Sequence, residues 1–169
     1  MSRAFVKEDS DAPEEPRKRF PSGRPNYVTP AGRAWLERRV ADLVSLRASL
    51  LAAKRTDSPR DLRLSQAELD LEYYESQLKR SLLVDNSGLA AADARFGAVV
   101  TAKEADGSVR EYSIVGEDEA DAASGKLNWA SPLAGALLGK KPGDKVSLPR
   151  NAGDLELEII SVRYPKRDS

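Results

Sequence analysis

The sequence WLERRVADLVSLRASL, residues 35–50, carries leucines at intervals of seven: Leu36, Leu43 and Leu50, with Val40 between the first two. A second run with the same spacing follows a polar break and consists of Leu64, Ala67, Leu71, Tyr74 and Leu78. Apolar residues at heptad spacing line one face of a helix, and that face is buried against a partner. Two matched runs predict an antiparallel helical hairpin, a coiled coil that spans residues 29–84.

The ends of this hairpin are marked by capping and helix-breaking residues. Thr29 is a suitable N-cap, and Pro30 occupies the first helical position, where a missing N–H is tolerated. Pro59 and its polar neighbours favour a turn, so we expect the tip at residues 56–60, between helices near 30–55 and 62–83.

Toward the N-terminus the composition changes. Residues 1–28 hold four of the ten prolines, an acidic cluster and the basic run PRKRF at 16–20. They offer few apolar side chains to offset the entropy of ordering, which predicts a flexible tail. The basic run either contacts nucleic acid or is a solvated run of charge, and the sequence leaves both interpretations open.

Toward the C-terminus, residues 85–94 resemble a linker, and residues 95–165 change to a pattern of short strands. Asp106-Gly107 is a hairpin-turn signal between two of them. The expected strands lie at 96–103, 109–116, 143–148 and 155–164.

One short helix is expected among these strands, at residues 131–140. Ser131 is its N-cap, Pro132 takes its first position and Gly139 stands near its end. Strands on either side of a single helix predict a small, mostly antiparallel sheet with that helix on one face. The fold class is therefore α+β, with a helical hairpin followed by a sheet domain.

The composition narrows the possible chemistry. The 169 residues include 27 basic and 27 acidic residues, no cysteine and no histidine. Disulfides, Cys/His zinc sites, thiol nucleophiles and imidazole acid–base catalysis are thereby excluded. No apolar run approaches the roughly 18–20 residues of a membrane span, and the N-terminus lacks the apolar core of a signal peptide. We expect a cytoplasmic protein.

The stretch IVGEDEAD, residues 114–121, places Glu117, Asp118, Glu119 and Asp121 close together. Three interpretations stay open. The acids could bind a hard cation such as calcium through oxygen ligands, although the spacing lacks EF-hand alternation. They could form a solvated turn. They could also form a docking surface for a basic partner, with Trp129 nearby as an apolar anchor or as a core residue.

The predicted hairpin tip carries a second charged group. Two carboxylates at the end of a long arm, Asp57 and Asp61, could complete a divalent metal site in another protein and position a water molecule. The basic residues around them could face a phosphate backbone and are Lys54, Arg55, Arg60 and Arg63. Alternatively, these residues are charged because helix ends and turns are solvated.

The C-terminal pattern resembles a known family. Residues 112–146 contain, in order, an IVG-x-DEAD-like run, an SP-x-A-x-x-L-x-G-K helix and a GD-x-V strand start. This order is similar to the signature of the bacterial Gre transcript-cleavage factors, GreA and GreB. YVTPAGRAWLERRVADL, residues 27–43, also resembles the start of their hairpin, and the match spans residues 27–164.

The resemblance implies a coiled-coil finger and a C-terminal domain of FKBP-like fold that docks on RNA polymerase, beside its secondary channel. Such a factor is a non-catalytic monomer without a cofactor or metal of its own, and it meets nascent RNA or DNA only within the transcription complex. The residues that match the family's docking motifs are Asp118, Glu119, Asp121, Ser131 and Pro132.

The sequence departs from the family at the tip. Cleavage-competent members carry an Asp-x-x-Glu pair that stabilises the second magnesium ion of the polymerase. No glutamate stands three residues after Asp57 or Asp61. The hairpin is also shorter by about a dozen residues, which removes roughly 10 Å of reach over two arms at about 1.5 Å per residue. Two functions therefore stay open: assistance of RNA cleavage through Asp57 and Asp61, or occupation of the channel as a competitor without cleavage.

An FKBP-like fold also raises the possibility of a peptidyl-prolyl isomerase. Such a site needs a concave apolar pocket lined by aromatic side chains. The domain offers only Phe96, Tyr112, Trp129 and Tyr164, and the core needs some of these.

Overall fold

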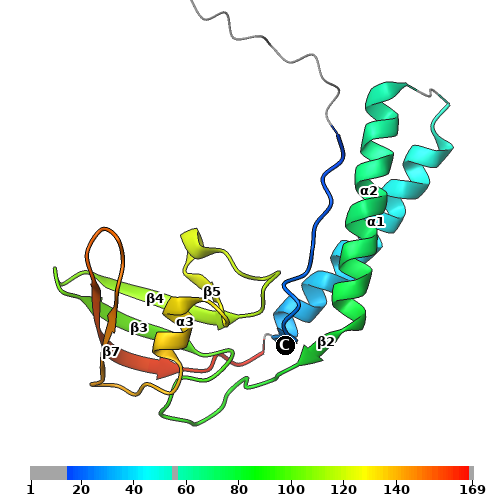
Figure 1. The fold of residues 1–169 in the computed structure, drawn as a ribbon. Coiled ribbons are helices and arrows are strands. Elements are labelled where there is room, and N and C mark those ends of the chain that lie inside the picture. The colour runs from blue at the N-terminus through cyan, green and yellow to red at the C-terminus, as the bar shows by residue number, and fades with distance from the viewer. Residues whose placement is uncertain (1–14, 55–56, 168–169) are drawn as a thin grey trace, which may run out of the picture.

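A computed structural model describes residues 15–54 and 57–167 (Figure 1). A helical hairpin and a sheet domain lie at the two ends of the molecule and meet at a narrow junction. The predicted α+β class, with an N-terminal hairpin and a C-terminal sheet, is confirmed. In the part of the chain that the structure describes, no helix combines the length and apolarity that a membrane span requires.

The hairpin consists of α1 (Pro30–Ala52) and α2 (Ser58–Lys79). Thr29 caps α1 as predicted, since its hydroxyl oxygen accepts the Gly32 N–H at 2.9 Å. The leucines of the first heptad run are buried, as are Ala67, Leu71 and Tyr74 of the second. Val40, Leu64 and Leu78 pack against this core from its edge.

The turn of the hairpin has the expected length but lies three residues earlier in the chain. α2 begins at Ser58 because the Asp57 carboxylate caps it, accepting the Arg60 N–H at 3.0 Å. Pro59 lies in the first turn of α2, where its missing N–H needs no partner. The connection therefore covers residues 53–57 rather than 56–60, and residues 55 and 56 lie outside the described part.

A two-stranded parallel sheet closes the base of the hairpin. β1 (Asn26–Val28) pairs with β2 (Ser81–Leu83), so the chain enters and leaves the hairpin side by side. The Asn26 amide also donates to the Gln77 carbonyl at 2.9 Å. The predictions of a flexible tail up to residue 28 and of a second helix that continues to residue 83 are wrong here, because residues 26–28 and 81–83 pair as strands and satisfy each other's backbone groups.

Residues 15–25 run along α2 toward this small sheet (Figure 1). The Arg17 N–H donates to Gln66 Oε1 at 2.7 Å, and Gln66 Nε2 returns a bond to the Arg17 carbonyl at 2.9 Å. Arg19 pairs with Asp70 at 3.5 Å and lies over the Tyr74 ring. This part of the predicted tail is thus held to the hairpin by its polar groups, while residues 1–14 lie outside the described part.

The sheet domain is a five-stranded mixed sheet in the order β5-β4-β3-β7-β6. All neighbours are antiparallel except β4 and β5, which are parallel. Gly107, with φ of 87°, makes the predicted turn between β3 and β4. The strands are β3 (Val99–Glu104), β4 (Val109–Val115), β5 (Lys126–Asn128), β6 (Lys145–Leu148) and β7 (Leu155–Arg163).

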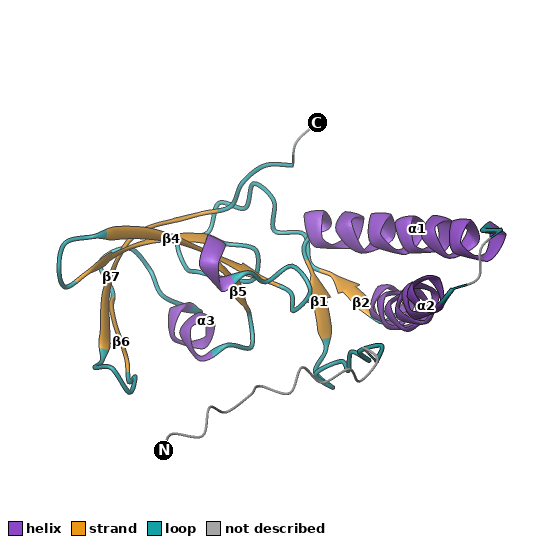
Figure 2. Ribbon diagram, turned by 90° about the horizontal axis from the view of Figure 1, so that it is seen from above, coloured by secondary structure: helices purple, strands orange, loops and turns teal. Residues whose placement is uncertain are grey.

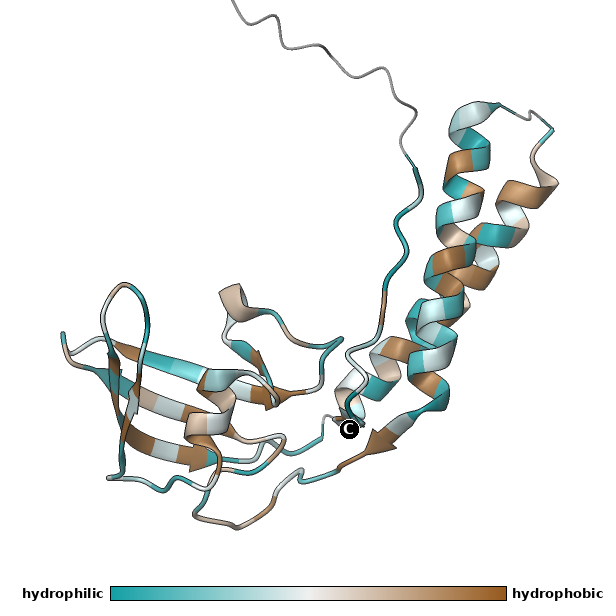
Figure 3. Cartoon of the chain, in the orientation of Figure 1, coloured by the Kyte–Doolittle hydropathy of each residue, from teal (hydrophilic) through white to brown (hydrophobic). Residues whose placement is uncertain are grey.

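The core of this domain lies between the sheet and the short helix α3 (Pro132–Leu137), which covers one face (Figure 2). Ser131 caps α3 as predicted. Apolar residues recur along the strands and α3 (Figure 3), and Val100, Ile114, Leu137 and Ile159 are almost fully buried. A single 3-10 turn, η1 (Ala122–Ser124), precedes β5, a strand that the sequence pattern did not reveal.

Candidate functional site

The acidic stretch lies at the junction and faces the hairpin. The Tyr73 hydroxyl donates to Asp118 Oδ1 at 2.7 Å. The Gln77 amide nitrogen donates to Asp118 Oδ2 at 2.7 Å and to Glu117 Oε1 at 2.5 Å. Both donors lie on α2, so two of the acids tie the sheet domain to the base of the hairpin.

The third acid contacts the start of α1. The Thr29 hydroxyl donates to the Glu119 carboxylate, whose oxygens lie at 2.7 and 2.9 Å. The first turn of α1 contains no acidic residue of its own. Since a helix N-terminus favours negative charge, Glu119 supplies it from the other domain. A β-carbon at Gly32 would lie only 3.3 Å from Glu119 Oε2, so the glycine admits this approach.

A tight turn explains why Glu119 reaches the start of α1 while Glu117 and Asp118 reach α2. The Ala120 N–H donates to the Gly116 carbonyl at 3.1 Å, and this closes residues 116–120 into a turn. Consecutive side chains of a turn point in different directions. Among residues 15–54 and 57–167, no three side chains of the metal-ligating types gather to hold an ion. The turn interpretation is thus correct in its backbone, but Glu117, Asp118 and Glu119 are half-buried against the hairpin rather than solvated.

These contacts change the ionisation of the tyrosine. Burial and the hydrogen bond to Asp118, followed by the charge of that carboxylate, raise the pKa of the Tyr73 phenol well above its usual range. The phenol therefore stays protonated and remains a donor throughout the neutral and moderately alkaline range.

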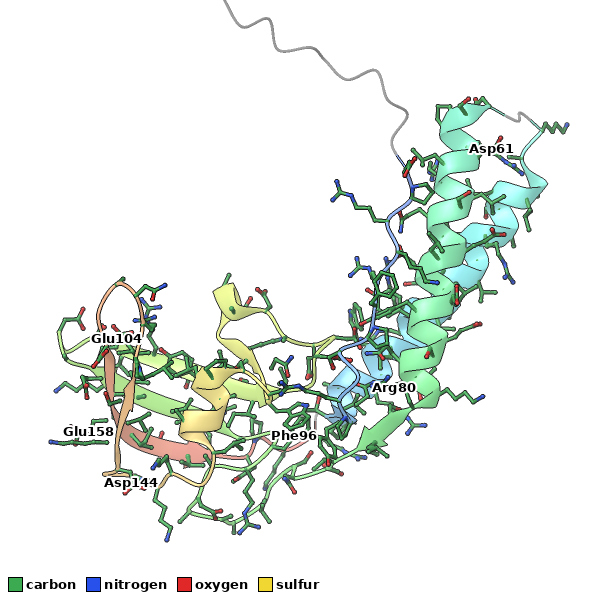
Figure 4. All side chains as sticks on the ribbon, viewed as in Figure 1. Asp61, Arg80, Phe96, Glu104, Asp144 and Glu158 are labelled. Atoms are coloured by element: carbon green, nitrogen blue, oxygen red, sulfur yellow. The ribbon has the colours of Figure 1, made fainter. Side chains whose placement is uncertain are left out.

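An aromatic cluster fills the rest of the junction. The Tyr27 ring of β1 lies 5.0 Å from the Trp129 ring, edge to face, and 6.1 Å from the Phe96 ring. Phe96 points into this region in Figure 4. Tyr112 and Tyr164 are buried in the core of the sheet domain. All four aromatic residues considered for an isomerase pocket therefore pack against the chain itself.

Gly116 allows the closest backbone approach at the junction. A β-carbon at this position would lie 2.3 Å from the Tyr27 carbonyl oxygen, so only glycine fits. This glycine belongs to the IVG stretch that precedes the acids. The motif therefore encodes a close contact with β1 as well as the acidic turn.

Two buried polar residues of α2 were not identified from the sequence. Asp70 and Gln77 are buried although they are polar, and both precede a heptad leucine by one position. Their own spacing of seven is a signal that could have revealed a polar stripe beside the apolar seam.

The remaining docking candidates lie outside this contact. Asp121 is exposed, and its carboxylate accepts a hydrogen bond from the Ser124 hydroxyl. Ser131 is half-buried, and its hydroxyl oxygen accepts the Ala134 N–H at 3.3 Å, whereas Pro132 beside it is exposed. The structure thus separates Asp118 and Glu119, which have partners within the chain, from Asp121 and Pro132, which face solvent.

At the opposite end of the hairpin, the two tip acids already have structural partners. Asp57 caps α2, and Asp61 pairs with Arg60 at 2.7 Å. The Arg60 guanidinium also donates to the Leu50 carbonyl at 2.9 Å, which ties the end of α1 to the start of α2. Asp61 remains 62% exposed at the far end of the hairpin (Figure 4). Lys54 and Arg63 are exposed, whereas Arg55 lies outside the described residues.

Comparisons with known proteins agree with this architecture. A model of the family "Transcription elongation factor, GreA/GreB, C-term" matches residues 90–164. Transcription elongation factor GreA of Hyphomonas neptunium is 40% identical over 122 residues, which cover 72% of this chain and 73% of that protein. The chain belongs to the GreA/GreB family of transcription elongation factors.

Two further members match over more of the chain. GreA of Beijerinckia indica is 34% identical over 152 residues, or 89% of this chain and 90% of that protein. GreB of Neisseria meningitidis is 32% identical over 157 residues, or 85% and 96%. The family assignment thus covers the hairpin as well as the sheet domain of this GreA/GreB-family protein.

Proposed function

We propose that this GreA/GreB-family protein binds RNA polymerase, inserts its hairpin into the secondary channel and regulates elongation by occupying that channel without stimulating RNA cleavage. The sheet domain docks at the rim, and the hairpin extends away from it. In this proposal the protein catalyses no reaction itself and acts on the active site of the polymerase.

The arrangement of the tip carries the proposal. Stimulated cleavage needs carboxylate oxygens that are free to hold a second magnesium ion. Here the Asp57 carboxylate caps α2, and the Asp61 carboxylate is paired with Arg60. The guanidinium also offsets the field of Asp61 at any nearby cation. Ligation of a magnesium ion by Asp57 and Asp61 would break the N-cap of α2 and the ion pair between Asp61 and Arg60.

The docking surface consists of Asp121, Ser131 and Pro132. Asp121 and Pro132 face solvent and can meet a partner without rearrangement. Docking through Asp118 and Glu119 would break their bonds to Tyr73, Gln77 and Thr29, so we assign these two acids to the junction instead.

A transcript-cleavage assay on a backtracked elongation complex with Mg²⁺ tests the proposal. The wild-type protein is expected to leave the transcript uncut and to slow cleavage by an added GreA factor in a dose-dependent manner. Robust cleavage by the wild type alone would overturn the proposal. Loss of the competition in an Asp121→Lys variant would show that the inhibition requires docking.

One observation favours a second candidate, assistance of cleavage. Asp61 is largely exposed at the tip and could exchange Arg60 for a metal ion. In that case the Asp57→Asn/Asp61→Asn variant would lose cleavage while it still competes with GreA. Asp42→Asn, on an exposed face of α1, is the matched control.

A further inference from the structure

A cleft of about 640 Å³ opens on the side of the junction where α1 begins. Its walls come from α1, from β5 and from the C-terminal segment after β7. Apolar residues form much of its floor and include Ala34, Val84, Val99 and Val115. A volume of this size lies within the range of about 300–1,000 Å³ that small-molecule sites occupy.

The rim of this cleft is basic. Arg38, Lys126, Lys166 and Arg167 line it, whereas Glu119 is the only acidic residue in its lining. Glu119 is bound to Thr29, and Arg167 pairs with Asp85 at 2.5 Å. Two positive charges remain uncompensated after both acids are counted, although the chain as a whole has no net charge.

A second cleft shows that this charge is not a general property of the surface. It lies at the end of the sheet remote from the hairpin, where Figure 4 labels Glu104 and Glu158, and it has a volume of about 320 Å³. Lys103 and Lys145 line it, but so do three glutamates: Glu104, Glu156 and Glu158. Its lysines are balanced by acids, so it supplies a natural control.

We infer that the junction cleft is a binding site for a nucleoside diphosphate. The apolar floor suits a base, and the basic rim suits two linked phosphate groups, for which charge-assisted hydrogen bonds to lysine and arginine are strong. The hydroxyl of Ser113 at the wall offers a further hydrogen-bond donor. This site goes beyond the proposed function and involves no residue of the hairpin tip.

A ligand in this cleft would connect the hairpin to the sheet domain. Arg38 belongs to the hairpin, whereas Lys126 belongs to the sheet domain. A diphosphate held between them adds a bond across the junction. The ligand therefore stabilises the arrangement in which the acidic turn contacts Tyr73 and Thr29.

Calorimetric titration of the full chain with ADP tests the inference. ADP is expected to bind the wild type with one saturable site, inorganic pyrophosphate more weakly, and adenosine not measurably. The variant Arg38→Ala/Lys126→Ala should lose at least about tenfold in affinity for ADP. Lys103→Ala/Lys145→Ala, in the control cleft, should bind ADP like the wild type.

Lys166→Glu provides a second variant on a different wall, and it should weaken ADP binding while the thermal midpoint of the free protein stays unchanged. A wild type that releases no saturable heat with ADP would refute the site. Equal losses in the junction and control variants would do the same, since they would indicate general attraction to basic residues. No polymerase is present in these titrations, so their outcome is independent of the cleavage assay.

Discussion

The phenolic oxygen of Tyr73 lies 2.7 Å from Oδ1 of Asp118, although 45 residues of chain separate the two. Tyr73 belongs to the hairpin, and Asp118 belongs to the acidic motif of the sheet domain. This bond gives the motif a role inside the molecule. The motif sets how the hairpin is held, while Asp121 and Pro132 face solvent.

Removal of this bond should weaken the junction. Tyr73→Phe leaves Asp118 with Gln77 as its hydrogen-bond partner, and a bond to a charged acceptor contributes about 1.5–3 kcal/mol. Because the site is half-buried, we expect a loss of about 1.5 kcal/mol in the free energy of unfolding by urea. Tyr112→Phe is the control, since no side-chain hydrogen bond is found for Tyr112 among the described residues. A Tyr73→Phe midpoint equal to that of wild type would contradict the expectation.

Alkaline pH should reveal the same contact. The pKa of Tyr73 is raised in the folded protein, chiefly by burial and then by the bond to Asp118. Its stabilising contribution is therefore complete below the pKa of an unfolded tyrosine, near 10, and is lost as the pH rises through the folded value. Urea midpoints measured from neutral pH to above pH 10 should converge for wild type and Tyr73→Phe at the alkaline end. A constant difference across that range would disprove the linkage.

Gly116 should not tolerate a side chain. A β-carbon there meets the Tyr27 carbonyl at 2.3 Å, and because both are backbone positions, the junction must shift. Gly116→Ala should cost about 1–3 kcal/mol, as overpacking does. Gly135→Ala is the matched control, since a β-carbon added at that residue of α3 would meet nothing within 4 Å. Thermal unfolding of both variants decides the matter.

The heptad seam should carry most of the stability of the hairpin. Leu43 and Leu71 are 3% exposed, so replacement of either by alanine should cost about 2–4 kcal/mol. Leu51→Ala, at a position 56% exposed on the same helix as Leu43, should change the free energy of unfolding by far less. Circular dichroism during urea unfolding measures all three, and equal losses would contradict a buried seam.

Docking should depend on Asp121 more than on other exposed acids. Asp121→Lys reverses a charge at the proposed polymerase surface and should mainly slow association, because clustered charge steers encounter. Asp154→Lys makes the same reversal on an exposed turn far from that motif in sequence. Surface plasmon resonance with immobilised polymerase compares the two rates. Unchanged association for Asp121→Lys would remove this residue from the docking surface.

The sequence predicts those parts of the fold that local periodicity and capping determine. Leucines at intervals of seven predict the hairpin, and Thr29 and Ser131 mark helix starts, because each signal acts within a few residues. The three-residue strands β1, β2 and β5 were missed. They exist because distant segments pair, and a stretch of three residues carries no measurable period of its own.

The residues of the candidate site were predictable from the sequence, but the part of the molecule that they contact was not. Four acids close together indicate a functional or structural role. Their charge alone does not show whether they contact another part of the chain or another molecule. The close approach at Gly116, the donors Tyr73 and Gln77 on α2 and the hydroxyl of Thr29 hold Asp118 and Glu119 against the hairpin. The hairpin tip was likewise predictable in composition only. Asp57 is a helix cap because α2 begins at Ser58, a start that the sequence pattern placed a few residues later.

The parallel pairing of β1 with β2 joins the segments that enter and leave the hairpin, so the hairpin extends from a closed base. Both of its ends are fixed to each other beside the junction, and Arg60 fixes its tip independently. Whole heptads could therefore be inserted into or removed from both helices together, and the acidic turn, the aromatic cluster and the junction cleft would keep their geometry. The length of the hairpin is therefore independent of the junction that sets its orientation. Relatives could differ in hairpin length while they keep the same junction.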